Sequence, residues 1–243
     1  REYLINIYES AVRDWGIDGL KLDFIGMFSE KGVDDLTAGE GRDYASVDKA
    51  VDRLMSDVMA RLRALNPDIA IEFRQPYNGP LMRKYGNMFR AVDCANVAVY
   101  NRRHIVDLRL IADNTAVHSD MIMWHPEESV EAAALQVLNI LFSVPQISVR
   151  LAEISPEHRQ MLKFWIGYWN EHKSILLDGD FRAVGPVLNY PMVTGRQDGK
   201  LIAAVYQDMF VLSGTGPLQA IDIVNGKPTA GVVVRMEQSL GKS

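Results

Sequence analysis

The stretch "IDGLKLDF", residues 17 to 24, places a lysine and an aspartate two positions apart in a segment that otherwise has the composition of a buried strand. Alternate residues of a strand point to the same face. Lys21 and Asp23 therefore share one face, and Leu20 and Leu22 share the other. Charged side chains are tolerated in such a strand where it lines an open mouth, so the place of this strand in the fold decides what the two charges do.

Helical and extended segments alternate on both sides of this strand. Before it, Leu4, Ile7 and Ala11 recur at helical spacing, and Gly16 stands where the helix is expected to end. After it come a polar loop at 26–42, a helix at 46–65, four strands at 69–73, 88–92, 116–124 and 145–151, and helical segments at 80–85, 101–113, 128–143 and 155–172. This alternation predicts crossover connections, and hence a parallel sheet with helices outside it.

Two architectures fit the alternation, a doubly wound open sheet and a (β/α)8 barrel. A doubly wound sheet usually carries a Gly-rich turn after its first strand, and no strand end here has the G-x-G-x-x-G pattern. We therefore expect a TIM barrel. Because a complete barrel takes about 250 residues, we expect residues 1–180 to form its C-terminal part, strands 4 to 8, with the first three strands upstream.

Residues 181–243 differ from the rest of the chain in their pattern of predicted secondary structure. They contain short β-rich runs and the turn pairs Asp198-Gly199 and Asn225-Gly226. This pattern predicts a second, small antiparallel β domain, which is expected to be incomplete at this length.

Four successive predicted strands end in ionisable side chains, which are Lys21 and Asp23, Glu72 and Arg74, Arg90 and Asp93, and His118 and Asp120. Catalytic groups of barrel enzymes lie at the C-terminal ends of the strands. Any one of these pairs is as well explained by a structural ion pair. Four of them on one rim predict an active site, which answers why two charges occur in the strand at residues 17 to 24.

Asp23 and Asp93 come from different strands and suit chemistry that needs two carboxylates in two protonation states. Glycoside hydrolysis is the plainest example, because one carboxylate attacks the anomeric carbon and the other, protonated, donates to the leaving oxygen. Lys21 is expected to hold Asp23 ionised by its opposite charge and to reach a sugar hydroxyl. Asp93 has fewer cations near it in sequence, which makes it the better proton carrier.

The motifs "LKLDF" at 20–24 and "MFRAVD" at 88–93, in this order of strands and helices, resemble glycoside hydrolase family 36 and its α-galactosidase (melibiase) relatives. The resemblance covers about residues 1 to 180. It implies a retaining, exo-acting enzyme with Asp23 as nucleophile, Asp93 as acid/base and Lys21 as a donor to a sugar hydroxyl. Family members commonly carry a Cys- and Gly-rich turn and an aromatic or Ser/Thr-rich stretch where this chain has "RQPYNG" and "FRAV", which leaves the sugar specificity open.

The remaining candidate residues each have two interpretations. Arg74 and Arg90 contact substrate, or they neutralise Glu72 and Asp93; His118, with Asp120, binds a sugar hydroxyl or is a satisfied structural histidine. Trp124, just past its strand, is an aromatic sugar platform or a core residue. Cys94 is expected to be a small buried apolar residue. We expect no metal, because His118 and Asp120 are only half of a site, and no cofactor.

Other functions compete with an α-galactosidase. A related α-glycosidase, acting on α-glucosides or α-N-acetylgalactosaminides, has the same motifs. A Schiff-base aldolase or lyase needs an uncharged Lys21, and Asp23 two residues away favours the charged form. A further, non-catalytic alternative is that the chain is a carbohydrate-binding fragment. In each case except the lyase the expected partner is an oligosaccharide or glycoside.

Composition narrows the partners further. The formal net charge of −5 argues against a nucleic-acid partner. No apolar run reaches the roughly 18 residues that a membrane span needs, so no membrane partner is expected. The sequence leaves open whether the protein forms a homo-oligomer, and whether it is cytoplasmic, periplasmic or secreted.

Overall fold

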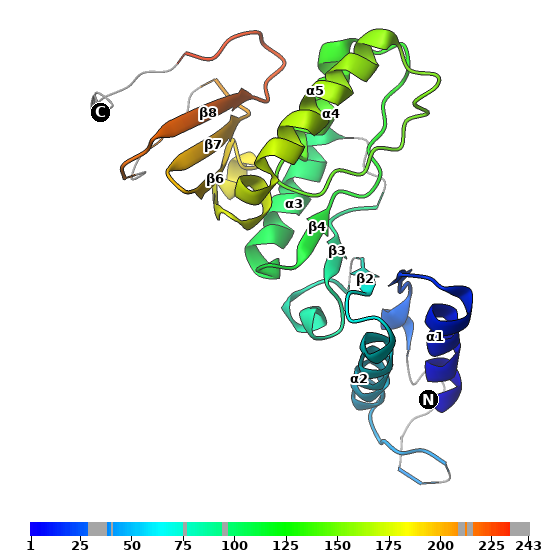
Figure 1. The fold of residues 1–243 in the computed structure, drawn as a ribbon. Coiled ribbons are helices and arrows are strands. Elements are labelled where there is room, and N and C mark those ends of the chain that lie inside the picture. Colours follow the sequence, from blue (N-terminus) through cyan, green and yellow to red (C-terminus); the bar gives the residue numbers. More distant parts are fainter. Residues whose placement is uncertain are drawn as a thin grey trace. The chain divides into compact units, whose positions relative to one another are not determined.

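The computed structural model describes residues 1–28, 38–39, 41–74, 77–93, 97–208, 212 and 216–233 (Figure 1). Cys94 lies outside these ranges, and so do the acidic residues Glu30, Asp34, Asp35 and Glu40 of the predicted loop. The chain forms two compact units, Arg1–Arg90 and Ala91–Ser243. None of the helices in the described ranges is long and apolar enough to cross a membrane.

The first unit combines two α-helices with three short parallel strands. In chain order its elements are α1 (Glu2–Trp15), β1 (Gly19–Lys21), the 3₁₀ helix η1 (Ile25–Met27), α2 (Val47–Leu65), β2 (Ala70–Phe73), the 3₁₀ helix η2 (Pro80–Lys84) and β3 (Met88–Arg90). Strand β2 lies in the middle, pairing in parallel with β1 on one side and with β3 on the other. The predicted parallel pairing is thus confirmed for these strands.

The helix ends of the first unit follow the sequence signals. Gly16 ends α1 with a left-handed φ of 68°, a conformation that glycine adopts at low cost. Ser46 begins α2, and its hydroxyl accepts a hydrogen bond from the backbone N–H of Lys49 at 3.4 Å. The two helices lie side by side (Figure 1), and Arg61 of α2 binds Glu2 of α1 at 2.6 Å.

The register of β1, β2 and β3 brings their C-terminal ends to one edge of the sheet. Lys21 lies opposite Glu72, and Phe73 lies opposite Phe89. Just before β3, a Cβ atom on Gly86 would lie 2.6 Å from the Phe73 ring, so only glycine allows the chain to pass this close to β2. Side chains that follow β1 and β2 are therefore neighbours.

The second unit contains three α-helices and a four-stranded sheet. Its elements are α3 (Ala98–Ala112), β4 (Ala116–His118), α4 (Val130–Asn139), α5 (Pro156–Lys173), the π-helix η3 (Ser174–Asp178), β5 (Asp180–Val184), the 3₁₀ helix η4 (Pro186–Leu188), β6 (Met192–Gln197), β7 (Lys200–Val205) and β8 (Ala220–Asn225). Ser129 and Ser155 begin α4 and α5, each accepting a hydrogen bond from the N–H three residues on.

The sheet of the second unit is mixed, and the prediction of an antiparallel domain is wrong for one of its strand pairs. Strands β5, β6 and β7 pair antiparallel, with the predicted Asp198-Gly199 turn between β6 and β7. Strands β7 and β8 pair in parallel. The connection from Val205 to Ala220 is long enough to carry the chain back to the starting edge, which a hairpin turn cannot do.

The predicted strands at 116–124 and 145–151 are largely absent from the described structure. The first is reduced to β4, because Asp120 has a φ of 68° and breaks the extended backbone. The second is replaced by one isolated parallel bridge, which joins Ile122 to Ile147, and a further bridge joins His118 to Val144 just before it. Strands β1 to β4 alternate with helices along the chain as predicted, but a closed barrel is not formed by the described strands.

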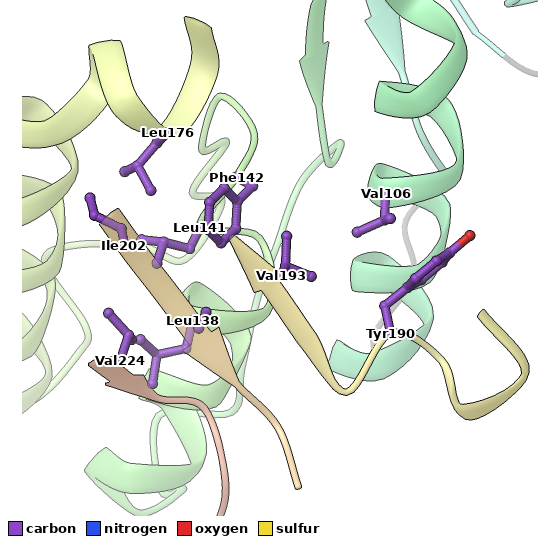
Figure 2. Close-up of a cluster of buried hydrophobic side chains, with 10 residues drawn as sticks. Val106, Leu138, Leu141, Phe142, Leu176, Tyr190, Val193, Ile202 and Val224 are labelled. Atoms are coloured by element: carbon purple, nitrogen blue, oxygen red, sulfur yellow. The ribbon is translucent and has the colours of Figure 1, made fainter. Parts of the chain in front are cut away.

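One hydrophobic core joins the helices and the sheet of the second unit (Figure 2). Val106 comes from α3, Leu138 from α4, Leu176 from η3, and Ile202 and Val224 from the sheet. Because these elements bury the same core, the sheet packs with the helices. The boundary between the two compact units falls after Arg90, and the domain division after residue 180 stays a prediction.

Arg109 of α3 adds a polar connection beside this core. Its Nη1 atom donates to the carbonyl oxygens of Phe142 and Leu176, and its Nη2 atom donates to that of Leu177, each at 2.7 Å. The guanidinium also lies over the Phe181 ring, 4.4 Å from its centroid. Burial lowers the pKa of Arg109 to about 10. One side chain thus joins the segment that follows α4 to η3.

Candidate active site

Asp23 lies just beyond the C-terminal end of β1, and three donors meet on one of its carboxylate oxygens. Oδ1 accepts hydrogen bonds from Nε of Arg74 at 2.5 Å, from the hydroxyl of Tyr77 at 2.6 Å and from the backbone N–H of Phe24 at 2.8 Å. The Asp23 side chain is 40% exposed. The carboxylate is therefore held in place and still open to solvent.

The parallel register of β1 and β2 explains why Arg74 reaches Asp23. Lys21 lies opposite Glu72, and its Nζ atom is 3.9 Å from Oε1 of Glu72. Two residues further along both strands, Arg74 meets Asp23. The charged faces predicted from alternation, Lys21 with Asp23 and Glu72 with Arg74, thus lie against each other as two cross-strand ion pairs.

Phe24 turns the chain directly after the carboxylate. Its φ of 55° is left-handed, which is uncommon for a bulky residue. The N–H of Phe24 is shared between Oδ1 of Asp23 and the hydroxyl of Tyr77, each at 2.8 Å. The Arg74 guanidinium lies 5.1 Å from the centroid of the Phe24 ring. Strained backbone of this kind persists where surrounding contacts fix it, and it is common at functional sites.

These contacts control the ionisation of Asp23. The hydrogen bond from Tyr77 and then that from Arg74 lower the pKa of Asp23 to about 2. Burial, followed by the bond to the Asp23 carboxylate, raises the pKa of Tyr77. Asp23 is therefore ionised and Tyr77 protonated at neutral pH. The sequence assigned the first role to Lys21, but Lys21 pairs with Glu72.

Sequence reasoning missed Tyr77, although it makes the largest contribution to the ionisation of Asp23. Tyr77 lies in a loop beyond β2, where alternation predicts no side-chain direction. The available signal was the position of "RQPYNG", a departure from the family pattern immediately after a strand that ends in charge.

In the second unit, Asp93 and the end of β4 belong to the same strand-end region. The backbone N–H of Ala91 donates to the carbonyl oxygen of His118 at 2.9 Å. Ala91 and Val92 are buried, and Asp93, which follows them, is exposed. The Asp93 side chain is therefore open to solvent.

His118 and Asp120 form a buried polar turn at the end of β4. Nδ1 of His118 accepts a hydrogen bond from the backbone N–H of Asp120 at 3.2 Å, and the Ser119 hydroxyl donates to the Asp120 carbonyl at 2.7 Å. The side chains of all three residues are buried. Like Phe24, Asp120 has a left-handed backbone immediately past a strand end, so both units place strained backbone at these positions.

Trp124 and Arg90 are also buried. The indole N–H of Trp124 donates to Nδ1 of His158 at 3.3 Å, and Nε2 of His158 lies 3.1 Å from the Glu128 carbonyl oxygen. These contacts support the core interpretation of Trp124 over that of a sugar platform. Arg90 accepts a hydrogen bond at its carbonyl oxygen from Nδ2 of Asn78, at 2.7 Å. Within the described part of the chain, no cluster of three or more His, Cys, Asp or Glu side chains could hold a metal.

Comparison with known proteins places the fold. No family model matches the chain, and no curated protein matches its sequence. Among solved structures, the GH36 α-galactosidase AgaA from Geobacillus stearothermophilus has a TM-score of 0.61 at 13% identity, over 79% of this chain and 27% of that one. The galactosidase domain of α-galactosidase-sucrose kinase, AgaSK, has a TM-score of 0.56 at 14% identity, over 80% of this chain and 27% of that one.

A cyclomaltodextrinase also matches, with a TM-score of 0.54 at 12% identity, over 85% of this chain and 40% of that one. The chain thus spans about a quarter of the length of the α-galactosidases it matches. At these identities the likeness is one of fold alone, and it covers part of each of these glycoside hydrolases.

Proposed function

We propose that the chain is the C-terminal part of the (β/α)8 barrel of a retaining, exo-acting glycoside hydrolase of the α-galactosidase type. Asp23 is the nucleophile and Asp93 is the acid/base. The observation that carries the proposal is the solvent-accessible Asp23 carboxylate, held ionised by Tyr77 and Arg74 at the C-terminal end of a parallel strand. The fold likeness to α-galactosidases supports the substrate class.

The reaction proceeds in two displacements. In the first, a lone pair of Asp23 attacks the anomeric carbon and the bond from that carbon to the leaving oxygen breaks. The leaving oxygen keeps the bonding electrons and takes the proton of Asp93. In the second, Asp93 removes a proton from water, the water oxygen bonds to the anomeric carbon, and the ester bond breaks to return the Asp23 carboxylate.

The other polar residues at the strand ends position the sugar. Lys21 is 45% exposed and donates to a sugar hydroxyl while it remains close to Glu72. Arg74 acts through its bond to Asp23. The turn of His118 and Asp120 lies next to the segment that carries Asp93, because the carbonyl oxygen of His118 accepts the N–H of Ala91.

The test is replacement of Asp23 by alanine in the full-length natural protein. Turnover of an aryl α-galactoside should be abolished, and added azide should restore it with formation of a glycosyl azide, because a small anion can take the vacated place of the nucleophile. Asp18→Ala is the matched control, since Asp18 is an exposed carboxylate at the opposite end of β1. Undiminished turnover by Asp23→Ala would exclude this residue as nucleophile.

A second candidate is a related α-glycosidase that acts on α-glucosides or α-N-acetylgalactosaminides. The fold likeness to a cyclomaltodextrinase favours it. A panel of aryl α-glycosides separates the two, since each enzyme should turn over its own sugar fastest. Binding of a sugar without turnover of any panel member would instead favour a carbohydrate-binding role.

A further inference from the structure

We infer that Tyr77 and Arg74 are positioning residues that hold Oδ1 of Asp23 and so select Oδ2 as the oxygen that bonds to the sugar. This rests on the proposed function, in which Asp23 is the nucleophile. The two side chains come from the segment that follows β2, and neither needs to touch the substrate to act. In this arrangement Oδ2 of Asp23 reacts with the sugar, and Oδ1 keeps its hydrogen bonds throughout the reaction.

The contacts of the carboxylate are one-sided. Nε of Arg74, the Tyr77 hydroxyl and the Phe24 N–H all donate to Oδ1, at 2.5, 2.6 and 2.8 Å. Within the described ranges, no donor binds Oδ2. A carboxylate oxygen has about two lone-pair sites, so three donors fully occupy Oδ1. Oδ2 keeps its lone pairs for bond formation.

Tyr77 also fixes the direction in which Oδ2 points. Its hydroxyl donates to Asp23 and accepts from the N–H of Phe24 at 2.8 Å. The same contact fixes the left-handed turn at Phe24, which sets the orientation of the residue before it. The other charged groups near this strand end, Lys21 and Glu72, are paired with each other at 3.9 Å. Tyr77 and Arg74 are therefore the side chains that orient and charge Asp23.

The two displacements use these donors differently. In the first, Oδ2 shares an electron pair with the anomeric carbon and the carboxylate loses its charge. In the covalent intermediate Oδ2 is the ester oxygen and Oδ1 is the carbonyl oxygen. In the second, the C–O bond to Oδ2 breaks and negative charge returns to the carboxylate, where the donors on Oδ1 stabilise it. Because an interaction accelerates a step only if it strengthens in the transition state, these donors chiefly accelerate the second displacement.

The kinetic test is Tyr77→Phe in the full-length natural protein, with an aryl α-galactoside that has a good leaving group. We expect kcat to fall roughly ten- to a hundred-fold, the range for losing one donor to a developing charge. KM should fall with it, and a burst of released phenol should appear, because the intermediate accumulates. The acid limb of kcat/KM should move to higher pH. Tyr85→Phe is the matched control, since Tyr85 donates to Asp52 in the same unit but away from the strand ends.

A second measurement does not depend on turnover. In protein labelled with ¹³C at the aspartate carboxyls, the Asp23 signal, assigned by its loss in Asp23→Asn, should titrate at higher pH in Tyr77→Phe than in wild type or Tyr85→Phe. Arg74→Lys, which keeps the charge and loses the Nε donor, should shift it in the same direction. It also replaces Tyr77→Phe if that variant does not fold.

The outcomes separate the two claims. An unchanged Asp23 titration, or Asp23-dependent turnover in which Tyr77→Phe shows neither a burst nor a moved acid limb, overturns the inference and leaves the proposed function standing. A shifted titration in a wild-type protein that turns over no glycoside overturns the proposed function and, with it, the choice of the reacting oxygen.

Discussion

Two carboxylates, one in each unit, gather three polar groups on a single oxygen. Oδ1 of Asp23 binds Arg74, Tyr77 and the N–H of Phe24. Oδ2 of Asp222 lies 2.9 Å from Nζ of Lys200, 3.2 Å from Nε2 of His172 and 3.2 Å from the hydroxyl of Tyr168. In contact geometry alone the two sites are nearly equivalent.

Their places in the fold are different. Asp222 lies within strand β8, and its partners come from α5 and β7, so the cluster ties a helix to the sheet. Burial opposes ionisation of Asp222, but the hydrogen bond from Lys200 and its charge outweigh it and the pKa is lowered. Asp23 lies past a strand end, next to the left-handed backbone of Phe24. A carboxylate with several donors therefore does not identify a site, and its position beyond a strand end is the more informative feature.

The largest expected difference is in activity. Asp23→Asn should lower kcat by on the order of a thousand-fold or more, as loss of a nucleophile does, because the amide cannot form the glycosyl ester. Asp222→Asn should keep kcat within about two-fold, since no sequence or fold signal places it at a strand end. Steady-state assays of both variants test this. A comparable loss in Asp222→Asn, with folding intact, would remove the distinction between the two sites.

The next effect is on stability, and it concerns Asp222. Replacing its carboxylate with a neutral amide removes the negative charge that Lys200 and Tyr168 both contact. Asp222→Asn should therefore lower the free energy of unfolding by about 1–2 kcal/mol, the range for a charged hydrogen bond reduced for partial exposure. Urea unfolding followed by tryptophan fluorescence measures it. Stability equal to wild type would mean that the cluster does not hold α5 to the sheet.

A smaller effect should appear as pH falls. The pKa of Asp23, about 2, is below the value of roughly 3.9 for an unfolded chain. The stability that its ionised form contributes is therefore present above about pH 4 and lost as pH falls toward 2. Urea midpoints of wild type and Asp23→Asn should differ most at neutral pH and converge between pH 4 and 2. A constant difference across this window would show that Asp23 is not ionised preferentially in the folded state.

The smallest effect should come from an exposed pair. Arg182 donates to Asp180 at 2.9 Å on strand β5, and both side chains are more than half exposed. Arg182→Ala should not measurably change the urea midpoint, because solvent screens such pairs. Arg182→Ala therefore serves as the reference for the stability loss of Asp222→Asn. If Arg182→Ala lowered the urea midpoint as much as Asp222→Asn, both losses would be attributed to a general change in surface charge.

The sequence predicted those features whose cause is local. Ser46, Ser155 and Gly16 mark helix ends by direct hydrogen bonding or backbone conformation, and the structure has helix ends at each of them. Alternation placed Lys21 and Asp23 on one face, and the register of β1 and β2 then brings Arg74 to Asp23.

Features that depend on distant segments were not predictable in this way. Tyr77 contacts Asp23 from a loop, where no periodicity fixes a side chain. Trp124 is buried because His158, 34 positions away, accepts its N–H. The parallel pairing of β8 was not predictable, because the turn pairs Ser213-Gly214 and Gly216-Pro217 in the connection before it do not indicate in which direction the next strand runs. The strand expected at 145–151 has the right composition, but within the described residues a single isolated bridge, Ile122 to Ile147, joins this segment to its neighbour.

Arg109 has a consequence for behaviour in concentrated salt. Its hydrogen bonds go to neutral carbonyl oxygens of Phe142, Leu176 and Leu177, so dissolved ions weaken these bonds less than they weaken an exposed ion pair. Lysine offers one charged centre in place of a planar fork and could not reach the same three acceptors together. The three hydrogen bonds of Arg109 in the second unit depend on the geometry of its guanidinium. They should therefore persist at salt concentrations that weaken the exposed ion pairs of the same unit.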